Sequence, residues 1–360
     1  MKKRLVIINP LLSFRVRVID CSPMLRLLQT IGKFIFFLAI GLFFVWLSIK
    51  DFNARQRAEI VSYIAAANYW LIVPIFILLV ISNLLRAARW SLLIRPLHYH
   101  PRLFNVFAAV MIGYLTNLAI PRAGEISRCG VLARYEKIPV DKLIGTMIAE
   151  RAVDVITMLV LLFFSVIIQL DIVGEFFFHQ FLRRQGNAAG KSYSIWVIAV
   201  AVILVMLGVW IMMRYFSHLR VYRKMRISII RIGRGFRTVL HMRGNIWFFI
   251  YTVLMWAVYL IMVKIGFYCL AETQQLGLKA ALAVLTFGSV GMLMPTQGGI
   301  GPYQLIVEKI LTLFSVPVKI SVAMSWILWI AQMGLYLVIG FIVLLILPML
   351  NPTRHDSAKT

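Results

Sequence analysis

Charged side chains interrupt three apolar stretches of this 360-residue sequence, and these stretches hold its strongest candidates for chemistry. The first is AERAVD, in which Glu150 stands four residues and Arg151 three residues before Asp154. On a helix, these spacings bring the side chains to one flank. If Lys142 marks the membrane interface, they lie about 12–18 Å further along the helix, near the middle of a ~30 Å hydrocarbon layer. Charges at that depth persist when paired or facing a wet cavity. We therefore expect a buried ion-pair lock between helices or the polar lining of a headgroup path, and the two roles are compatible.

The second stretch is AIPRAGEISRCG, residues 119–130. Pro121 lacks an amide donor and is expected to end the preceding helix, while Gly124 permits a tight reversal of the chain. A new helix should begin near Gly124 with Glu125 in its first turn, where an acid suits the positive end of the helix dipole. Arg128 follows at the helical spacing of three residues. The alternative is an ordinary interfacial loop whose arginines contact lipid headgroups.

The third stretch, PTQGGIG, runs from Pro295 to Gly301. Glycines at positions such as Gly298 and Gly299 would let backbone N–H groups point into a cavity, with a short helix starting near Pro302. A glycine-rich turn that leads into a helix N-terminus is suited to binding anions. The spacing does not match a phosphate-binding P-loop. The alternative is a plain tight turn.

Together, the three stretches predict a site near the middle of the bilayer with both signs of charge. Its charged members are three arginines and three acids: Arg122, Arg128, Arg151, Glu125, Glu150 and Asp154. Because the charges balance, we expect the site to suit a phosphate-bearing or zwitterionic headgroup better than a bare ion.

The composition indicates which class of fold holds these residues in place. Hydrophobic residues make up 61% of the chain, charged residues 14%, and the mean hydropathy is +0.88. Several apolar runs reach the roughly 20 residues that cross a bilayer, so we expect an all-α, polytopic helical membrane protein. The net charge of +25 gathers between these runs. Cytoplasmic loops and anionic lipids account for such an excess without nucleic acid. Three scattered cysteines and six histidines show no disulfide or metal pattern, and no cofactor is expected.

The loop charges also predict the topology. The connection 214–245 carries nine basic residues and no acid, which places it in the cytoplasm. Counting from it gives about six spanning helices, with the run 70–85 ending at the cytoplasmic interface beside Arg86 and Arg89. The six predicted spans are 31–49, 70–85, 143–170, 195–213, 246–270 and 321–349.

Two apolar segments, about 103–135 and 280–314, would then begin and end on the same side of the membrane. We expect each to be a re-entrant helical hairpin, the two coming from opposite faces and meeting near the midplane, because irregular backbone at that depth needs a protein or water-filled surround. Their turns share the pattern Pro-x-x-Gly-x-Ile, at Pro121 and Pro295, which suggests inverted halves. The predicted domains are a basic cytoplasmic segment 1–30, a transmembrane domain 31–349 and a cytoplasmic tail 350–360. Met24 is an alternative start.

The three motifs resemble those of the lysylphosphatidylglycerol synthase transmembrane-region family, also called flippase-like membrane proteins. The similarity extends over about residues 30–345 and includes an R-x-x-R-W motif that ends at Trp90. It implies a flippase-like fold and adds Asn117 and Gln304 to the predicted headgroup-binding residues. Gln297 stands where the family often has proline, and Gln304 where it often has glutamate, so the lipid preference is expected to differ. The motif positions are Asn117, Pro121, Arg122, Gly124, Glu125 and Arg128; Glu150, Arg151 and Asp154; and Pro295, Gly298, Gly299, Ile300 and Gly301.

The chain ends at Thr360 without a soluble acyltransferase-like domain, so the resemblance implies the flippase-like part and not the lipid-aminoacylating enzyme. We expect a transporter of the inner membrane, with both termini cytoplasmic, that moves a phospholipid or polyprenyl-phosphate-linked lipid. One alternative is an accessory protein that binds a lipid-linked sugar for a partner synthase or glycosyltransferase. Another is a membrane enzyme that uses the acids of the site for acid–base chemistry. A homo-oligomer is compatible with each.

Overall fold

A computed structural model describes residues 23–169 and 245–351. Every regular element in these two ranges is a helix, which confirms the all-α fold class of a polytopic membrane protein. The predicted span 195–213 and nearly all of the basic connection 214–245 lie outside the described residues. The longer helices are α1 (Pro23–Ile49), α2 (Ala54–Ala66), α3 (Ile72–Ile94), α4 (Leu103–Ala119), α5 (Gly124–Glu136), α6 (Val140–Ile168), α10 (Asn245–Gly266), α11 (Leu278–Met292), α12 (Pro302–Leu313) and α13 (Val318–Leu350).

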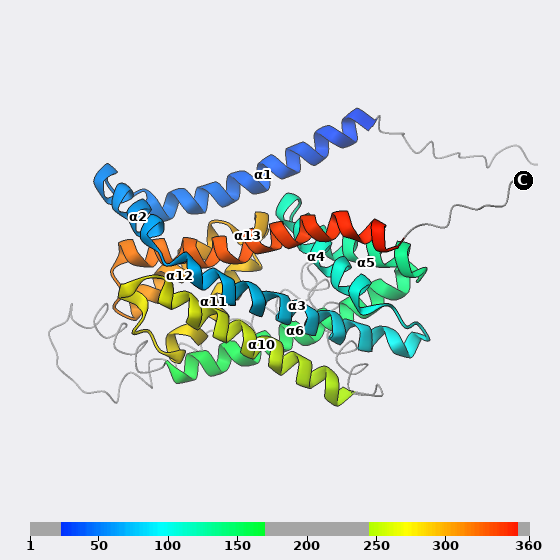
Figure 1. The fold of residues 1–360 in the computed structure, drawn as a ribbon. Coiled ribbons are helices and arrows are strands. Elements are labelled where there is room, and N and C mark those ends of the chain that lie inside the picture. Colours follow the sequence, from blue (N-terminus) through cyan, green and yellow to red (C-terminus); the bar gives the residue numbers. More distant parts are fainter. Residues whose placement is uncertain (1–22, 170–244, 352–360) are drawn as a thin grey trace, which may run out of the picture.

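The membrane-crossing helices run roughly lengthwise through the molecule (Figure 1). The apolar part of α1 and helix α2 meet at a bend of 107°, so they form either a broken span or a re-entrant segment. The described residues therefore hold four or five spans, and the count of six stays a prediction, as does the division into domains. The four unbroken spans are Tyr69–Leu97, Val140–Ile168, Asn245–Cys269 and Val318–Leu350.

Helices α4 and α5 form the first predicted hairpin. Helix α4 ends just before Pro121, and α5 begins at Gly124, as expected. The two helices approach closely because neither Gly113 nor Gly124 carries a side chain: a Cβ built on Gly124 would lie 2.0 Å from the Gly113 carbonyl oxygen. The Asn117 side chain closes the turn, since its Oδ1 accepts the Gly124 N–H at 2.7 Å.

Helices α11 and α12 form the second hairpin, which enters from the other end of the molecule (Figure 1). The two ends of α13 show this arrangement. The start of α4, in the first hairpin, adjoins the C-terminal end of α13 through the side chains of Asn105 and Asn351. Helix α12, in the second hairpin, leads directly into the first turn of α13. The hairpin tips touch, because Arg122 Nη2 donates to the Leu293 carbonyl at 3.3 Å. Two helical hairpins from opposite ends, predicted from loop charge, are therefore present.

Each hairpin has its own apolar core. Around the first, buried side chains of α3, α4, α5 and α6 pack together, while a second cluster joins α11, α12 and the first half of α13. The inverted halves suggested by the shared turn pattern stay a prediction. Fully buried members of the first core include Leu79, Met111 and Leu132, and those of the second include Ala281, Val307 and Met324.

Helix α1 docks on the second hairpin through backbone and polar contacts. Gly41 faces the tip so closely that a Cβ on Gly301 would lie 2.3 Å from the Gly41 carbonyl oxygen. Gln297 Nε2 donates to the Phe34 carbonyl of α1 at 2.9 Å. Further along, Ser48 Oγ donates to the buried Glu308 carboxylate at 2.5 Å. Small residues and interhelical hydrogen bonds are the usual basis of helix association in membranes.

Replacement of Gly124 by alanine should destabilise the first hairpin. The new methyl group would meet backbone atoms of α4, which cannot turn aside as a side chain can, so overpacking should cost about 1–3 kcal/mol. Gly130→Ala in the same helix is the matched control, since nothing lies within 4 Å of its Cβ position. We expect the melting temperature of the detergent-purified protein to fall only for Gly124→Ala; an equal response of both variants would contradict the close α4–α5 contact.

Cysteine labelling should test the re-entrant hairpins directly. In a background without native cysteines, single cysteines at Arg102 and Lys137 flank the first hairpin, and cysteines at Lys279 and Ser315 flank the second; all four positions are exposed. A membrane-impermeant maleimide should label the first two positions from one side of the membrane and the last two from the other. Labelling of Arg102→Cys and Lys137→Cys from different sides would show that the first hairpin crosses the bilayer.

Candidate functional site

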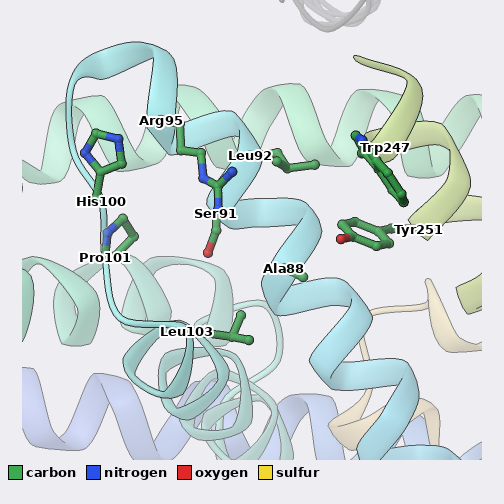
Figure 2. A pocket seen from close by; sticks show the side chains of 9 residues that line it. All are labelled: Ala88, Ser91, Leu92, Arg95, His100, Pro101, Leu103, Trp247 and Tyr251. Atoms are coloured by element: carbon green, nitrogen blue, oxygen red, sulfur yellow. The ribbon is translucent and has the colours of Figure 1, made fainter. Parts of the chain in front are cut away.

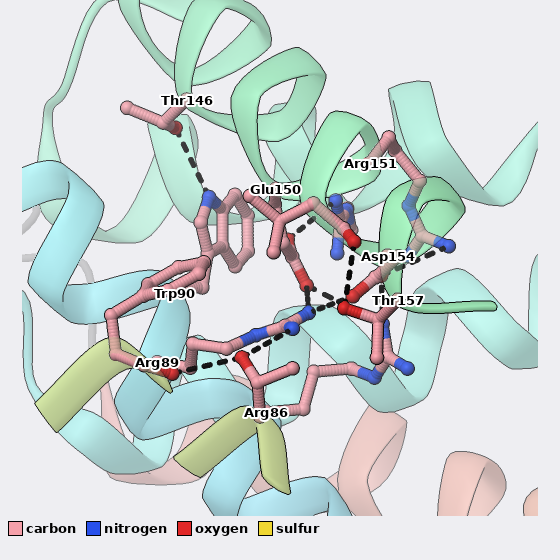
Figure 3. A network of polar contacts seen from close by, with 12 residues as sticks. Arg86, Arg89, Trp90, Thr146, Glu150, Arg151, Asp154 and Thr157 are labelled. Carbon is pink, nitrogen blue, oxygen red and sulfur yellow. Dashed lines mark hydrogen bonds and ion pairs between the residues drawn. The ribbon is translucent and has the colours of Figure 1, made fainter. Parts of the chain in front are cut away.

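Five charged side chains from three helices form a buried cluster behind the first hairpin, which we call the charge cluster (Figure 3). Helix α3 contributes Arg86 and Arg89, α5 contributes Arg128, and α6 contributes Glu150 and Asp154. The spacings of three and four residues put the pair on α3 and the pair on α6 each on one face of its helix. The side chains of Arg89 and Glu150 are fully inaccessible to solvent. Glu150 is ten residues into α6, about 15 Å along its axis.

Glu150 is the centre of the charge cluster. Its Oε1 accepts from Arg89 Nη2 at 3.0 Å and from Arg86 Nη1 at 3.4 Å, and its Oε2 lies 2.9 Å from Arg128 Nη2. Asp154 shares two of these arginines: its carboxylate accepts from Arg89 at 2.6 Å and from Arg86 at 3.2 Å. Glu150 is thus the carboxylate that holds α3 and α5 against α6.

Aromatic rings and hydroxyl groups surround the guanidinium groups. The Arg128 guanidinium lies over the Trp90 ring, 4.6 Å from its centroid, and Trp90 Nε1 donates to Thr146 Oγ1 at 3.0 Å. Ring faces attract cations, most strongly where water is excluded. This contact fixes the position of Arg128 relative to both α3 and α6.

Helix α10 closes the side of the charge cluster away from the hairpin. Arg89 lies over the Phe248 ring at 5.2 Å and donates to Thr252 Oγ1 at 3.2 Å. Arg86 donates to the Tyr259 hydroxyl at 3.3 Å. These hydroxyl groups supply polar partners without adding negative charge.

The charge cluster carries more positive than negative charge, because three arginines share two carboxylates. The Nε atoms of Arg86, Arg89 and Arg128 are buried and have no hydrogen-bond partner among the described residues. Buried donors are normally paired, so such groups call for an explanation. A bound anion with several oxygen atoms would supply both the missing charge and the missing acceptors.

Arg151 and Glu125 lie at the rim of the charge cluster. Arg151 Nε lies 3.5 Å from Glu125 Oε1, with 36% and 41% of the two side chains exposed. Arg151 also lies 3.8 Å from Asp154. This rim pair is neutral in sum and joins the start of α5 to α6.

Of the predicted site residues, the structure therefore brings together Arg128, Glu150 and Asp154, with Arg151 and Glu125 beside them. The predicted balance of charge differs from the observed one, since Arg86 and Arg89 take part and Arg122 does not. Arg122 is exposed, adopts a φ of +65° and contacts the second hairpin. Asn117 and Gly124 close the first turn through their hydrogen bond, and Pro121 lies within that turn.

The second turn differs from our expectation that its glycine N–H groups point into a cavity. The Gly299 N–H donates to the Thr296 carbonyl at 3.3 Å, and the Gly301 N–H donates to Gln304 Oε1 at 2.6 Å. Gln304 thereby fills the third helical position of a capping box, which satisfies amide groups at a helix start. Positive φ angles at Gly298, Gly299 and Gly301 let the chain fold back on itself after Pro295.

The helix of the second predicted span is longer than the expected run 70–85. Helix α3 continues to Ile94, and Arg86 and Arg89 are buried within it because α6 presents carboxylates to them. Their position relative to the membrane interface stays a prediction. Two features of the sequence indicate this buried pairing. Apolar residues continue on both sides of the arginines, and Arg86 and Arg89 share one helix face, as Glu150 and Asp154 do. Among the described residues, no group of three or more histidine, cysteine or acidic side chains is placed to hold a metal ion.

Glu150→Gln should destabilise the protein strongly. Three guanidinium groups would then share one carboxylate, and removal of one partner from a buried ion pair costs about 3–5 kcal/mol. Glu125→Gln is the control, because a half-exposed pair contributes less than about 1 kcal/mol. Melting temperatures measured by fluorescence-detected size exclusion should separate the two variants clearly. A loss in Glu150→Gln no larger than that in Glu125→Gln would contradict a stabilising role for the charge cluster.

Comparison with known proteins agrees with this architecture. The sequence profile of the family described as "Lysylphosphatidylglycerol synthase TM region" matches residues 34–340. A UPF0104 membrane protein of Methanocaldococcus jannaschii is 28% identical over 121 residues, which span 33% of this chain and 34% of that protein. No solved structure gives a significant match. Because the profile covers both hairpins and the charge cluster, the resemblance drawn from the three motifs is confirmed, and the chain belongs to the lysylphosphatidylglycerol synthase transmembrane-region family.

Proposed function

We propose that this membrane protein moves a phospholipid or a polyprenyl-phosphate-linked lipid between leaflets by binding its phosphate at the charge cluster. The observation that carries the proposal is the unbalanced positive charge of Arg86, Arg89 and Arg128 against two carboxylates. An uncompensated charge inside a membrane is costly. A phosphate would neutralise it and accept from the unpartnered Nε groups, and guanidinium groups match phosphate geometry well.

The rim pair Arg151–Glu125 suggests how a headgroup reaches the buried arginines. This pair is half-exposed and its closest atoms are 3.5 Å apart, so separating it costs little compared with breaking the buried contacts of Glu150. A phosphate that displaces Glu125 from Arg151 gains a further cation at the rim. Arg122, exposed at the contact between the hairpin tips, offers the same kind of group on the route towards the other leaflet. The lipid tails stay in the bilayer throughout.

We further propose that the protein binds and moves its lipid without covalent chemistry. The carboxylates of Glu150 and Asp154 are held by guanidinium groups, and this pairing disfavours their use as acid–base catalysts. The basic connection 214–245 supports an orientation with both termini in the cytoplasm of an inner-membrane protein. A partner synthase or glycosyltransferase would supply or consume the transported lipid.

A reconstituted assay tests the transport proposal. Liposomes that contain the purified protein should accelerate loss of fluorescence from an outer-leaflet reporter phospholipid that moves between leaflets. Arg128→Lys keeps the charge but loses the guanidinium geometry, and Arg122→Ala removes an exposed cation; each should slow movement by about 10-fold or more, the effect of one charge-assisted hydrogen bond. Arg55→Ala, an exposed arginine on α2, is the control and should retain the wild-type rate.

The same liposomes distinguish the other functions. No acceleration with phosphatidylglycerol, phosphatidylethanolamine or a polyprenyl phosphate would contradict transport. Saturable binding of one of these lipids without acceleration would favour the accessory role, in which the protein presents a lipid-linked sugar to an enzyme. Release of a chemically altered lipid from the purified protein would favour an enzyme.

A further inference from the structure

A cavity lies beside the last turns of α3 (Figure 2). It has a volume of about 410 Å³ and is enclosed by the last turns of α3, the first turns of α10 and the segment that leads into α4. We call it the α3–α10 pocket. Its lining includes Ser91 of α3, Arg95 directly after that helix, His100 of the connecting segment, and Trp247 and Tyr251 of α10.

The α3–α10 pocket is distinct from the charge cluster because the two use different faces of the same helices. Along α3 and the residue that follows it, the pocket residues Ala88, Ser91, Leu92 and Arg95 have a spacing of three, four and seven, which is one stripe of a helix. At about 100° per residue, Arg86 and Arg89 lie on the other side. On α10, Trp247 and Tyr251 line the pocket, whereas Phe248 and Thr252 contact Arg89.

Ser91 is the observation that indicates a ligand. Its side chain is 93% buried, and its Oγ has no hydrogen-bond partner among the described residues. Figure 2 shows this hydroxyl directed into the space between Ala88, Pro101 and Leu103. Serine on a helix usually bonds back to its own backbone, as Ser82 of the same helix does. An unpaired buried hydroxyl costs free energy unless a ligand or water completes it.

The polar groups around the α3–α10 pocket include one cation, Arg95, and the His100 imidazole. The described residues that line the pocket include no acid. Together with the Ser91 hydroxyl they supply donors at separate points around one space. A phosphate group, which has several acceptor oxygens and negative charge, fits this donor set.

The apolar part of the lining favours a lipid over a free phosphate ion. Trp247 and Leu103 are about half-exposed, and Leu92 adds a further aliphatic side chain to the lining. Tryptophan and tyrosine at a helix end, beside basic residues, are typical of the membrane interface, where phosphate groups lie. We propose that the α3–α10 pocket binds an anionic phospholipid from the surrounding leaflet. This lipid is separate from the transported one, and its binding does not depend on the transport proposal.

Native mass spectrometry of the purified full chain, titrated with phosphatidylglycerol in detergent, tests this assignment. Arg95→Ala and Ser91→Ala should each weaken the retention of one lipid by about 10-fold or more, as expected for the loss of a hydrogen bond to a charged group. Arg95→Lys should recover part of the retention, and Arg55→Ala on the distant helix α2 should retain wild-type affinity. Ser91→Ala should not lower the melting temperature without lipid, because it removes an unpaired buried hydroxyl.

The remaining outcomes decide between the sources of the phosphate. Competition by inorganic phosphate against the retained phosphatidylglycerol would assign the pocket to a free anion and overturn the lipid. Retention by Arg95→Ala equal to that by Arg55→Ala would overturn the site itself. A lower melting temperature of lipid-free Ser91→Ala would show that the hydroxyl has a structural partner in the protein. That result would also contradict the proposed lipid site.

Discussion

The structure depends on keeping Glu150 charged in the interior of a membrane protein. A carboxylate there is tolerated only with close cationic partners, and three helices supply them: Arg86 and Arg89 from α3 and Arg128 from α5. Each of these arginines would in turn be costly without the acids of α6. The ion pairs therefore fix the relative rotation of α3, α5 and α6, and they fix the position of the first hairpin along α6. Apolar packing alone specifies such registers poorly in a bilayer, because lipid tails compete for the same surfaces.

The turns of the two hairpins interrupt the helices, so backbone N–H groups at these turns need partners other than the helix itself. The first turn uses the Asn117 side chain to bind the Gly124 N–H, and the second uses Gln304 to bind the Gly301 N–H. Each turn thus pairs a backbone N–H at the start of its second helix with a nearby side chain, and the charged groups of the site come from side chains on the helices behind the tips. The functional groups are consequently held by rigid elements and not by the turns, and such an arrangement favours precise positioning.

Much of this arrangement could be predicted from the sequence because it follows from local rules. Proline and glycine positions placed both helix reversals, and the distribution of basic residues indicated from which end each hairpin enters. The role of Arg86 and Arg89 was harder to see, because their depth depends on acids some 60 residues away in α6. The hydrogen bond from the Gly301 N–H to Gln304 was not predicted, for a related reason. Gln304 can accept from Gly301 only once α12 has formed. The buried Glu308 lies in none of the three motifs; its carboxylate pairs with the adjacent Lys309 and with Ser48 of α1, which is 260 positions away.

The docking of α1 has a consequence for how the protein is made. Its contacts with the second hairpin join residues 260 and 263 positions apart in the chain. A ribosome that adds about 5–20 residues per second needs roughly 15–50 seconds to bridge that interval. During this time α1 has not yet met its partner, and Ser48 has no Glu308 to bind. Helix α1 is therefore made well before the hairpin on which it docks, and this docking is a late step of assembly.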